Sequence, residues 1–375
     1  MREKFLKIIL LSIFLPAILI LLVVLISNLI LPPPEFDEDL HSIRNKFMNN
    51  HFDRYFIPSS QSDDVSETER LLLKMDNRKI EFKKKPEENV YRIIALGCST
   101  TQGWPFHMRV SYPDFLRKYL EELLPEKKIE VINLGLNGTD ALISLSVMKE
   151  AVLSAPNLVI VDLGNSESWS HSARIGGRAA VTRIQGFLRK NVRAYAHIEN
   201  MVPRTQLSEE EKIRLIREQK EPDMDLLEKL FLKNLDKINR LAIKNDIGIV
   251  FLTQVGEGST SRNRLNQAIR RFGQEKNIEI LDVVEHFKNS GIDERDLILP
   301  DAMHPTAEGY LEMAYAVVSG LYEKNLVTPP ENWRWERISK KEDYLNEFDL
   351  TREYMEDIYT TYGLNMEYMR ESFKE

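Results

Sequence analysis

The chain has 375 residues, of which 43% are hydrophobic, and this is enough to bury the core of one large domain or two small ones. Its formal net charge of -7 argues against a nucleic-acid partner, because a polyanionic backbone requires a basic surface. The single cysteine, Cys98, excludes an intramolecular disulfide framework, so the hydrophobic core must stabilise the fold.

The N-terminal segment predicts a membrane anchor over residues 1–31. Residues 8–31 carry no charge, and about 20 such residues span a bilayer as a helix. The stretch is longer than the apolar core of about 7–15 residues in a signal peptide, and no small-residue cleavage pattern follows it. Arg2, Lys4 and Lys7 precede the span, so we expect a cytoplasmic N-terminus and an extracytoplasmic main domain.

Residues 32–89 are predicted to be a stalk and lead-in, because they begin with three prolines and continue mostly polar. From residue 90 the pattern becomes regular. Short apolar runs rich in Ile and Val are too short for helices and predict buried strands. These runs cover 90–97, 129–135, 158–164, 247–254 and 278–283.

Segments with helical periodicity alternate with these strands. They cover 112–124, 139–154 with Thr139 as the expected N-cap, 224–244, 261–276 and 306–322. Strands that alternate with helices predict an α/β domain, here residues 90–325, whose parallel sheet is covered on both faces.

Two segments fall outside this alternation. Residues from about 170 to 223 form an insertion with an excess of Arg and Lys, typical of a solvated face or of a cap that contacts an anionic partner. Residues 326–375 are expected to form a helical tail, in which Met355, Ile358, Tyr359 and Tyr362 have the spacing of packing residues.

Polar residues follow the predicted strands, at the edge of the sheet where open α/β folds place their sites. Ser99 follows the first strand, Gly138 the second and Asn165 the third. A serine hydroxyl becomes a nucleophile only with a base, a carboxylate that orients this base, and donors for the oxyanion. Asp301 and His304, three residues apart, have the spacing at which the carboxylate holds one imidazole nitrogen and the other faces a serine.

Four motifs in this order resemble the conserved blocks of the SGNH (GDSL-type) hydrolases. They are GCSTTQG, NLGLNG, GNSE and DAMHPTAEGY, and they lie between residues 93 and 310. The resemblance implies a flavodoxin-like α/β/α sandwich with a central parallel sheet of about five strands. It also implies hydrolysis of an ester, or transfer of an acyl group, at an exposed serine.

The same resemblance assigns roles to individual residues. Ser99 would be the nucleophile, His304 the general base and then the general acid, and Asp301 the residue that orients His304. The backbone N–H groups of Ser99 and Gly138 would donate to the oxyanion.

The chain departs from the family pattern in two places. The Asp that usually precedes the serine is Cys98 here. In the GNSE motif the strict equivalent of the family's oxyanion asparagine is Ser166, with Asn165 one residue earlier. Either residue could therefore complete the oxyanion hole.

Three functions follow from this pattern. The first is a membrane-anchored serine esterase that acts on short O-acyl esters of a glycan or lipid through an acyl-enzyme. The second is an O-acyltransferase that modifies an envelope or exported polysaccharide, with a separate membrane protein as acyl donor. The third is a non-catalytic module that binds carbohydrate or lipid.

Several ring side chains lie beside the predicted site in the sequence and suit sugar faces or acyl chains equally well. They are Trp104, Phe106, Trp169 and His171. The other histidines lack metal-ligand spacing with Cys or carboxylates, and the glycines do not form a phosphate loop. We therefore expect neither a metal nor a cofactor.

Overall fold

The computed structural model describes residues 26, 30, 56–59, 62–68, 80–106, 110–167, 223–256, 260–351 and 353–360, with backbone alone for 56–59, 62–68 and 294. The chain divides into two compact units. The first comprises Met1–Asp53, Leu71–Lys74 and Arg174–Ile216, of which only Ile26 and Ile30 are described; both are helical and exposed. All further structure belongs to the second unit.

The predicted membrane anchor lies outside the described residues, except for Ile26 and Ile30. Within the described ranges, no helix has both the length and the apolar character needed to cross a bilayer. The basic residues of the predicted insertion also lie outside the described residues.

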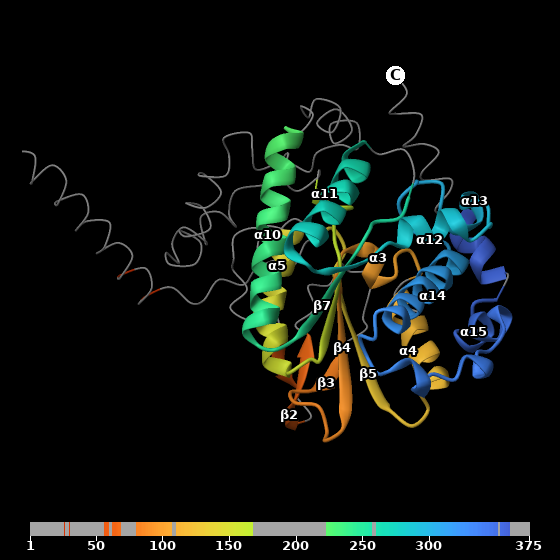
Figure 1. Cartoon of the computed structure of the whole chain (residues 1–375), viewed down its shortest axis with the longest axis horizontal. Coiled ribbons are helices and arrows are strands. Elements are labelled where there is room, and N and C mark those ends of the chain that lie inside the picture. The colour runs from red at the N-terminus through yellow and green to blue at the C-terminus, as the bar shows by residue number, and fades with distance from the viewer. Residues whose placement is uncertain are drawn as a thin grey trace, which may run out of the picture. The chain divides into compact units, whose positions relative to one another are not determined.

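Five parallel strands form the central sheet, each overlapping a strand predicted from the sequence. They are β4 (Val90–Gly97), β5 (Lys128–Gly135), β6 (Leu158–Asp162), β7 (Gly248–Leu252) and β8 (Glu279–Leu281), in the order β5-β4-β6-β7-β8 (Figure 1). This order is flavodoxin-like, and it reverses direction between β4 and β6. The ends of these two strands therefore flank the crevice in which such folds place their sites.

Helices cover both faces of this sheet, which confirms the predicted α/β/α sandwich (Figure 1). On one face Ile93, Ile160 and Val250 join the core formed with α4 (Tyr112–Leu123) and α14 (Ala307–Glu323). The next residue along each strand turns to the opposite face, because side chains alternate in a strand. That face is covered by α5 (Ala141–Ala151), α10 (Met224–Lys244) and α11 (Thr260–Lys276).

The start of α5 differs from the prediction by one residue. Asp140 is the N-cap, and its carboxylate accepts hydrogen bonds from the backbone N–H groups of Leu142 and Ile143. The Thr139 hydroxyl instead donates to the Leu136 carbonyl at 2.8 Å. Thr139 thus stabilises the turn before the helix.

Several short elements gave no signal in the sequence. They are α3 (Ser99–Gln102), α12 (Val283–Asn289), α13 (Glu294–Leu297) and an antiparallel sheet of β1 (Phe56–Ser59), β2 (Ser62–Thr68) and β3 (Glu81–Lys83). The antiparallel sheet lies within the segment predicted to be a stalk and lead-in. Its central strand, SDDVSET, contains one apolar residue, so no alternating pattern could reveal it.

The C-terminal tail packs on the domain. It contains η2 (Pro330–Asn332), η3 (Trp335–Arg337), α15 (Lys341–Glu347) and a helical stretch over 353–360. Met355, Ile358 and Tyr359 contact the hydrophobic core, as their spacing predicted. Tyr362 lies outside the described residues.

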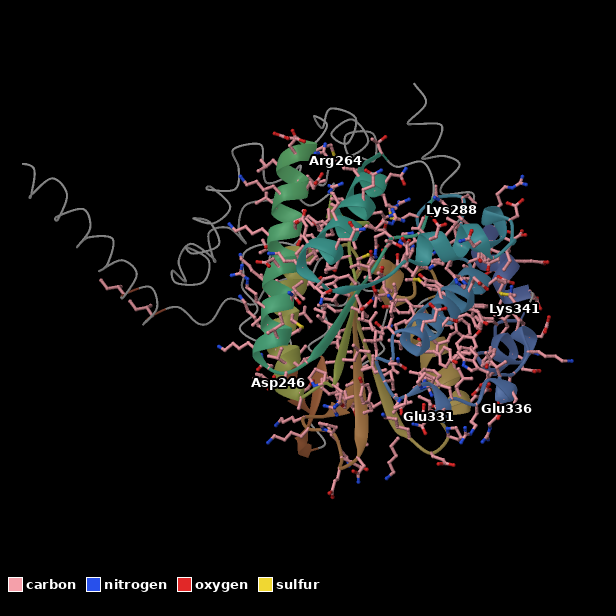
Figure 2. The ribbon with its side chains drawn as sticks, viewed as in Figure 1. Asp246, Arg264, Lys288, Glu331, Glu336 and Lys341 are labelled. Atoms are coloured by element: carbon pink, nitrogen blue, oxygen red, sulfur yellow. The ribbon has the colours of Figure 1, made fainter. Side chains whose placement is uncertain are left out.

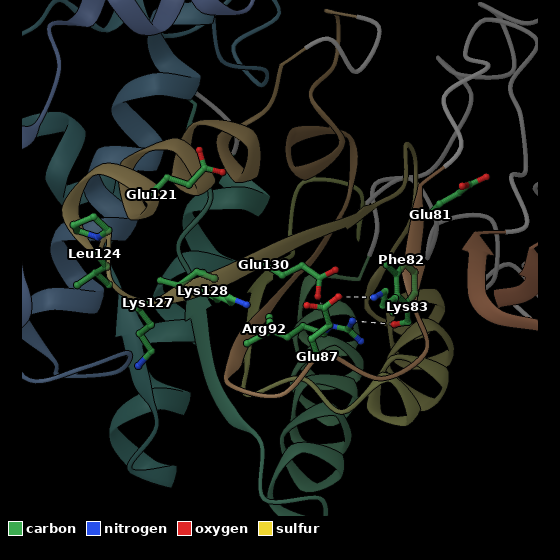
Figure 3. A pocket seen from close by; sticks show the side chains of 13 residues that line it. Glu81, Phe82, Lys83, Glu87, Arg92, Glu121, Leu124, Lys127, Lys128 and Glu130 are labelled. Carbon is green, nitrogen blue, oxygen red and sulfur yellow. Dashed lines mark hydrogen bonds and ion pairs between the residues drawn. The ribbon is translucent and has the colours of Figure 1, made fainter. Parts of the chain in front are cut away.

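A cavity of about 620 Å³ lies at the beginning of β4 and β5, where Figure 3 shows its lining. Buried Arg92 lies at this cavity and donates to Glu130 Oε2 at 2.7 Å, to the Ser154 carbonyl at 2.6 Å and to the Lys83 carbonyl at 2.9 Å. An eight-residue strand spans roughly 26 Å, so the cavity is far from the crevice at the other end of β4.

Candidate active site

Ser99 lies at the sharp turn that leads from β4 into the short helix α3. Gly97 ends the strand, and a Cβ at this position would lie 1.9 Å from Thr101 Oγ1 and 2.6 Å from the Asp162 carbonyl oxygen. Only glycine permits this close approach, so the chain can turn at Cys98 and begin α3 with Ser99.

The structure brings Ser99, His304 and Asp301 together, although they lie in widely separated parts of the sequence. Ser99 Oγ is 2.7 Å from His304 Nε2, and His304 Nδ1 is 2.5 Å from Asp301 Oδ2. An ionised carboxylate only accepts hydrogen bonds, so Nδ1 carries the proton and Nε2 accepts from the Ser99 hydroxyl. This arrangement lets His304 remove the serine proton.

The loop before α14 holds Asp301 in place. Its second carboxylate oxygen, Oδ1, accepts from the backbone N–H groups of Met303 at 2.9 Å and His304 at 3.0 Å. Burial opposes ionisation of Asp301, but the hydrogen bonds that it accepts from His304 and Met303 hold its pKa below the usual value. Asp301 is therefore a carboxylate at neutral pH.

Gly138 lies in an exposed turn that is attached to the end of β4. The backbone N–H of Leu136 donates to the Gly97 carbonyl at 3.1 Å, which ties this turn to the residue that ends β4. Gly138 itself has a φ of +70°. The turn thus places the Gly138 backbone on the same edge of the sheet as Ser99.

Asn165 and Ser166 are both buried after β6, but they have different partners. Asn165 Oδ1 accepts from Arg262 Nε at 2.7 Å, and its Nδ2 donates to Thr100 Oγ1 at 3.1 Å. Ser166 hydrogen-bonds the Cys98 side chain. Both side chains therefore lie beside the residues that flank Ser99, and both remain candidates for the oxyanion hole.

Cys98 precedes Ser99, but its environment does not activate it. Burial, together with the charge of Asp162, raises the pKa of the Cys98 thiol to about 11, although hydrogen bonds with the Thr100 backbone and with the Ser99 and Ser166 side chains oppose this rise. A thiol with this pKa is protonated at neutral pH and is a poor nucleophile. The site therefore favours Ser99 over its neighbour.

Sequence reasoning missed three polar residues that support the site, of which Asp162 and Arg262 are buried and Asn133 is partly buried. Burial raises the pKa of Asp162 to about 6, while hydrogen bonds from Thr101 and Gln254 oppose this rise. Asn133 donates to the Thr101 carbonyl at 2.7 Å and thus anchors α3 to β5. Arg262 had a signal in the sequence, because a cation in the first turn of a helix opposes the helix dipole.

The rings expected beside the site have different roles. Phe106 is fully buried and packs edge-to-face on Tyr310 and Tyr359, so it belongs to the core and offers no surface for a ligand. Trp104 is partly buried, whereas Trp169 and His171 lie outside the described residues. In the described part of the chain, no group of three or more His, Cys, Asp or Glu side chains is placed to hold a metal ion.

Solved structures that are similar to this chain include several esterases and lipases. A G-D-S-L family protein from Desulfitobacterium hafniense is 18% identical with a TM-score of 0.42, and the match covers 61% of this chain and 99% of that one. An acetylxylan esterase from Geobacillus stearothermophilus is 15% identical with a TM-score of 0.42, over 62% and 94% of the two chains. A lipase/acylhydrolase from Enterococcus faecalis is 14% identical with a TM-score of 0.41, over 67% and 100%.

No curated protein matches the chain. The sequence profile of the GDSL-like Lipase/Acylhydrolase family matches residues 95–311, which is more than half of the chain and includes every candidate site residue named above. The chain therefore belongs to the GDSL-like lipase/acylhydrolase family.

Proposed function

We propose that the protein is a serine esterase that hydrolyses O-acyl esters, with Ser99 as nucleophile, His304 as general base and acid, and Asp301 as the residue that orients His304. The observation that carries this proposal is the 2.7 Å contact between Ser99 Oγ and His304 Nε2, together with the His304–Asp301 pair. A module that only binds its ligand has no need of this alignment.

The reaction begins with transfer of the Ser99 hydroxyl proton to His304 Nε2 while Oγ attacks the ester carbonyl carbon. The carbonyl π electrons move to oxygen, where the backbone N–H groups of Ser99 and Gly138 and the side chain of Asn165 or Ser166 donate hydrogen bonds. Collapse of this intermediate expels the alcohol, which takes the proton from His304, and leaves an acyl group on Ser99.

Water then completes the cycle. His304 takes a proton from the water as its oxygen attacks the acyl carbon, and the carboxylic acid leaves as His304 returns the proton to Ser99 Oγ. Replacement of this water by a sugar hydroxyl converts hydrolysis into acyl transfer. The two activities therefore differ only in the acceptor.

We also propose that the enzyme is anchored in a membrane by residues 1–31, with its catalytic domain outside the cytoplasm. The support is the uncharged stretch 8–31 and the basic residues before it. Protease added to right-side-out vesicles should digest the domain, and inside-out vesicles should protect it. The opposite pattern would reject this orientation.

The catalytic proposal is tested with the full-length chain. p-Nitrophenyl acetate, butyrate and octanoate should give a burst of nitrophenol, and a fluorophosphonate probe should label the peptide that contains Ser99. Ser99→Ala should abolish both signals, whereas Ser290→Ala, a partly exposed hydroxyl that donates to the Phe287 carbonyl, should retain them. Turnover that survives Ser99→Ala would refute the proposal.

A second arm separates hydrolysis from transfer. Acylated product on an added oligosaccharide, in excess over free acid, would identify an acyltransferase. Free acid alone, with an unchanged oligosaccharide, identifies an esterase. The lengths of the acyl chains that are turned over then define the specificity, for which we expect acetyl and butyryl esters to be favoured.

A further inference from the structure

Arg262 lies near the beginning of α11 and is only 5% exposed. Its Nε donates to Asn165 Oδ1 at 2.7 Å, and its Nη1 donates to the Ala302 carbonyl at 2.7 Å. Asn165 belongs to the loop after β6, whereas Ala302 lies between Asp301 and His304. One rigid guanidinium group thus joins two loops that carry candidate site residues, the loop after β6 and the loop between α13 and α14.

The first contact fixes the orientation of the Asn165 side-chain amide. Because Oδ1 accepts a hydrogen bond from Arg262 Nε, the amide nitrogen Nδ2 must point to the other side. There it donates to Thr100 Oγ1 at 3.1 Å. Thr100 is adjacent to Ser99 in α3. Without Arg262, the amide could rotate and turn an acceptor oxygen toward the nucleophile helix.

The second contact holds the loop that carries the acid–base pair. Ala302 has a φ of +55°, and this left-handed conformation is unfavourable for a residue with a Cβ. A strained backbone persists only where its surroundings hold it. The hydrogen bond from Arg262 to the Ala302 carbonyl is one of the interactions that hold this loop.

Gly256, in the loop after β7, makes room for this contact. A Cβ at Gly256 would lie 2.3 Å from the Ala302 carbonyl oxygen and 2.6 Å from Arg262 Nη1, and the residue has a φ of +108°. Any larger side chain would therefore collide with both partners of the hydrogen bond. This independent feature indicates that the local backbone accommodates the link from Arg262 to Ala302.

We propose that Arg262 is a positioning residue for the esterase reaction. It holds the Asn165 amide and the Asp301–His304 loop in fixed positions relative to Ser99 and to each other. This inference rests on the proposed function. Arg262 acts through these two loops and does not itself touch the reacting atoms. Its loss should therefore lower kcat and leave KM nearly unchanged, because the ground-state contacts of the substrate do not depend on it.

The test replaces Arg262 with Lys, which retains the positive charge but has a single nitrogen and cannot donate along both directions. We expect kcat of Arg262→Lys to fall by about 10- to 100-fold, with KM within about twofold of the wild type. Arg264, labelled in Figure 2, provides the matched control on the same helix, since its partners Glu228 and Asp225 belong to α10 and not to the two loops that Arg262 contacts. Arg264→Lys should retain wild-type kcat.

Two further variants sharpen the test. Gly256→Ala retains Arg262 but obstructs its contact with Ala302, so it should show the same fall in kcat. Added guanidinium ion, at concentrations below those that unfold the chain, should partly restore kcat in Arg262→Ala and leave the wild type unchanged. A structural role alone predicts neither the rescue nor the unchanged KM.

The outcomes separate this inference from the proposed function. Wild-type kcat in Arg262→Lys would overturn the role of Arg262 while the esterase assignment stands. Failure of Arg262→Lys to fold, judged by circular dichroism, would also overturn the proposed role. Arg262 would then be needed for folding and not for the positions of the site residues. A wild-type chain that is inert toward esters and toward the fluorophosphonate probe would refute both.

Discussion

Two buried arginines, at opposite ends of the sheet, serve different purposes. Arg92, at the cavity where β4 and β5 begin, donates to Glu130 and to the carbonyls of Ser154 and Lys83. Arg262, at the other end, donates to two loops that carry candidate site residues. The first arginine fastens secondary-structure elements and their ends together, and the second holds loops around Ser99.

This difference shows that burial of a charged side chain does not by itself identify a functional site. Arg92 is 0% exposed and Arg262 is 5% exposed, so their burial is nearly the same. What separates them is the nature of their acceptors and the end of the strands at which they lie. We therefore expect substitution of Arg262, at the Ser99 end of the strands, to change turnover. Substitution of Arg92, at the opposite end, should change stability.

The largest effect should come from Asp301→Asn at the Ser99 end. An amide at this position no longer holds His304 in the tautomer that accepts the Ser99 proton, so kcat should fall by about 10³- to 10⁴-fold. The free energy of unfolding should change by only about 1 kcal/mol. Steady-state kinetics and urea unfolding of the same preparation measure both, and an active Asp301→Asn enzyme would contradict the assigned role.

Arg92→Met should show the opposite pattern. It leaves the carbonyls of Ser154 and Lys83 without their donor, the first of them in a buried hydrogen bond, and should lower the free energy of unfolding by about 3–5 kcal/mol. Glu130 is one-third exposed and can be hydrated, so it contributes little to this loss. The kcat of the folded fraction should stay within twofold, and Arg117→Met, at a surface pair with Glu121, should cost less than about 1 kcal/mol.

The smallest expected effect concerns Asp162, which lies at the Ser99 end but is fully buried. Burial raises its pKa from 3.8 to about 6, so the folded state binds more protons than the unfolded state between these values. Stability should therefore fall as pH rises through this window, by about 2–3 kcal/mol. Asp162→Asn should remove this part of the pH dependence.

Urea unfolding at pH 4.5 and 7.5 measures this contribution. The exposed Glu126→Gln serves as the matched control, and its pH dependence should follow that of the wild type. If the free energy of unfolding changes with pH equally in the wild type and in Asp162→Asn, then Asp162 does not titrate as its burial implies.

Much of the fold could be predicted because its parallel strands are short, continuous apolar runs. Val90–Gly97 and Leu158–Asp162 are buried on both faces, so their composition alone identified them. The helix Met224–Lys244 matched its predicted bounds because it is long and amphipathic. The small antiparallel sheet gave no such signal, since its central strand has almost no apolar side chains.

The candidate site could be predicted only in part. Ser99, Asp301 and His304 lie in motifs with a characteristic spacing, and the ends of parallel strands bring such motifs to one edge. Arg262 could not be assigned in this way, because its contacts depend on how α11 packs against two loops distant in sequence. The N-cap at Asp140 was missed for a related reason, since both Thr139 and Asp140 are good capping residues and only the backbone geometry decides between them.

The pairing of Ser99 with His304 bridges a sequence separation of 205 residues. A contact of this range forms only after nearly the whole sheet and α14 have assembled, because the cost of closing so long a loop must be offset by the packing of everything between. Recovery of ester turnover should therefore lag behind recovery of helical signal when the denatured chain is returned to buffer. Enzymatic activity thus returns only when assembly of the domain is complete.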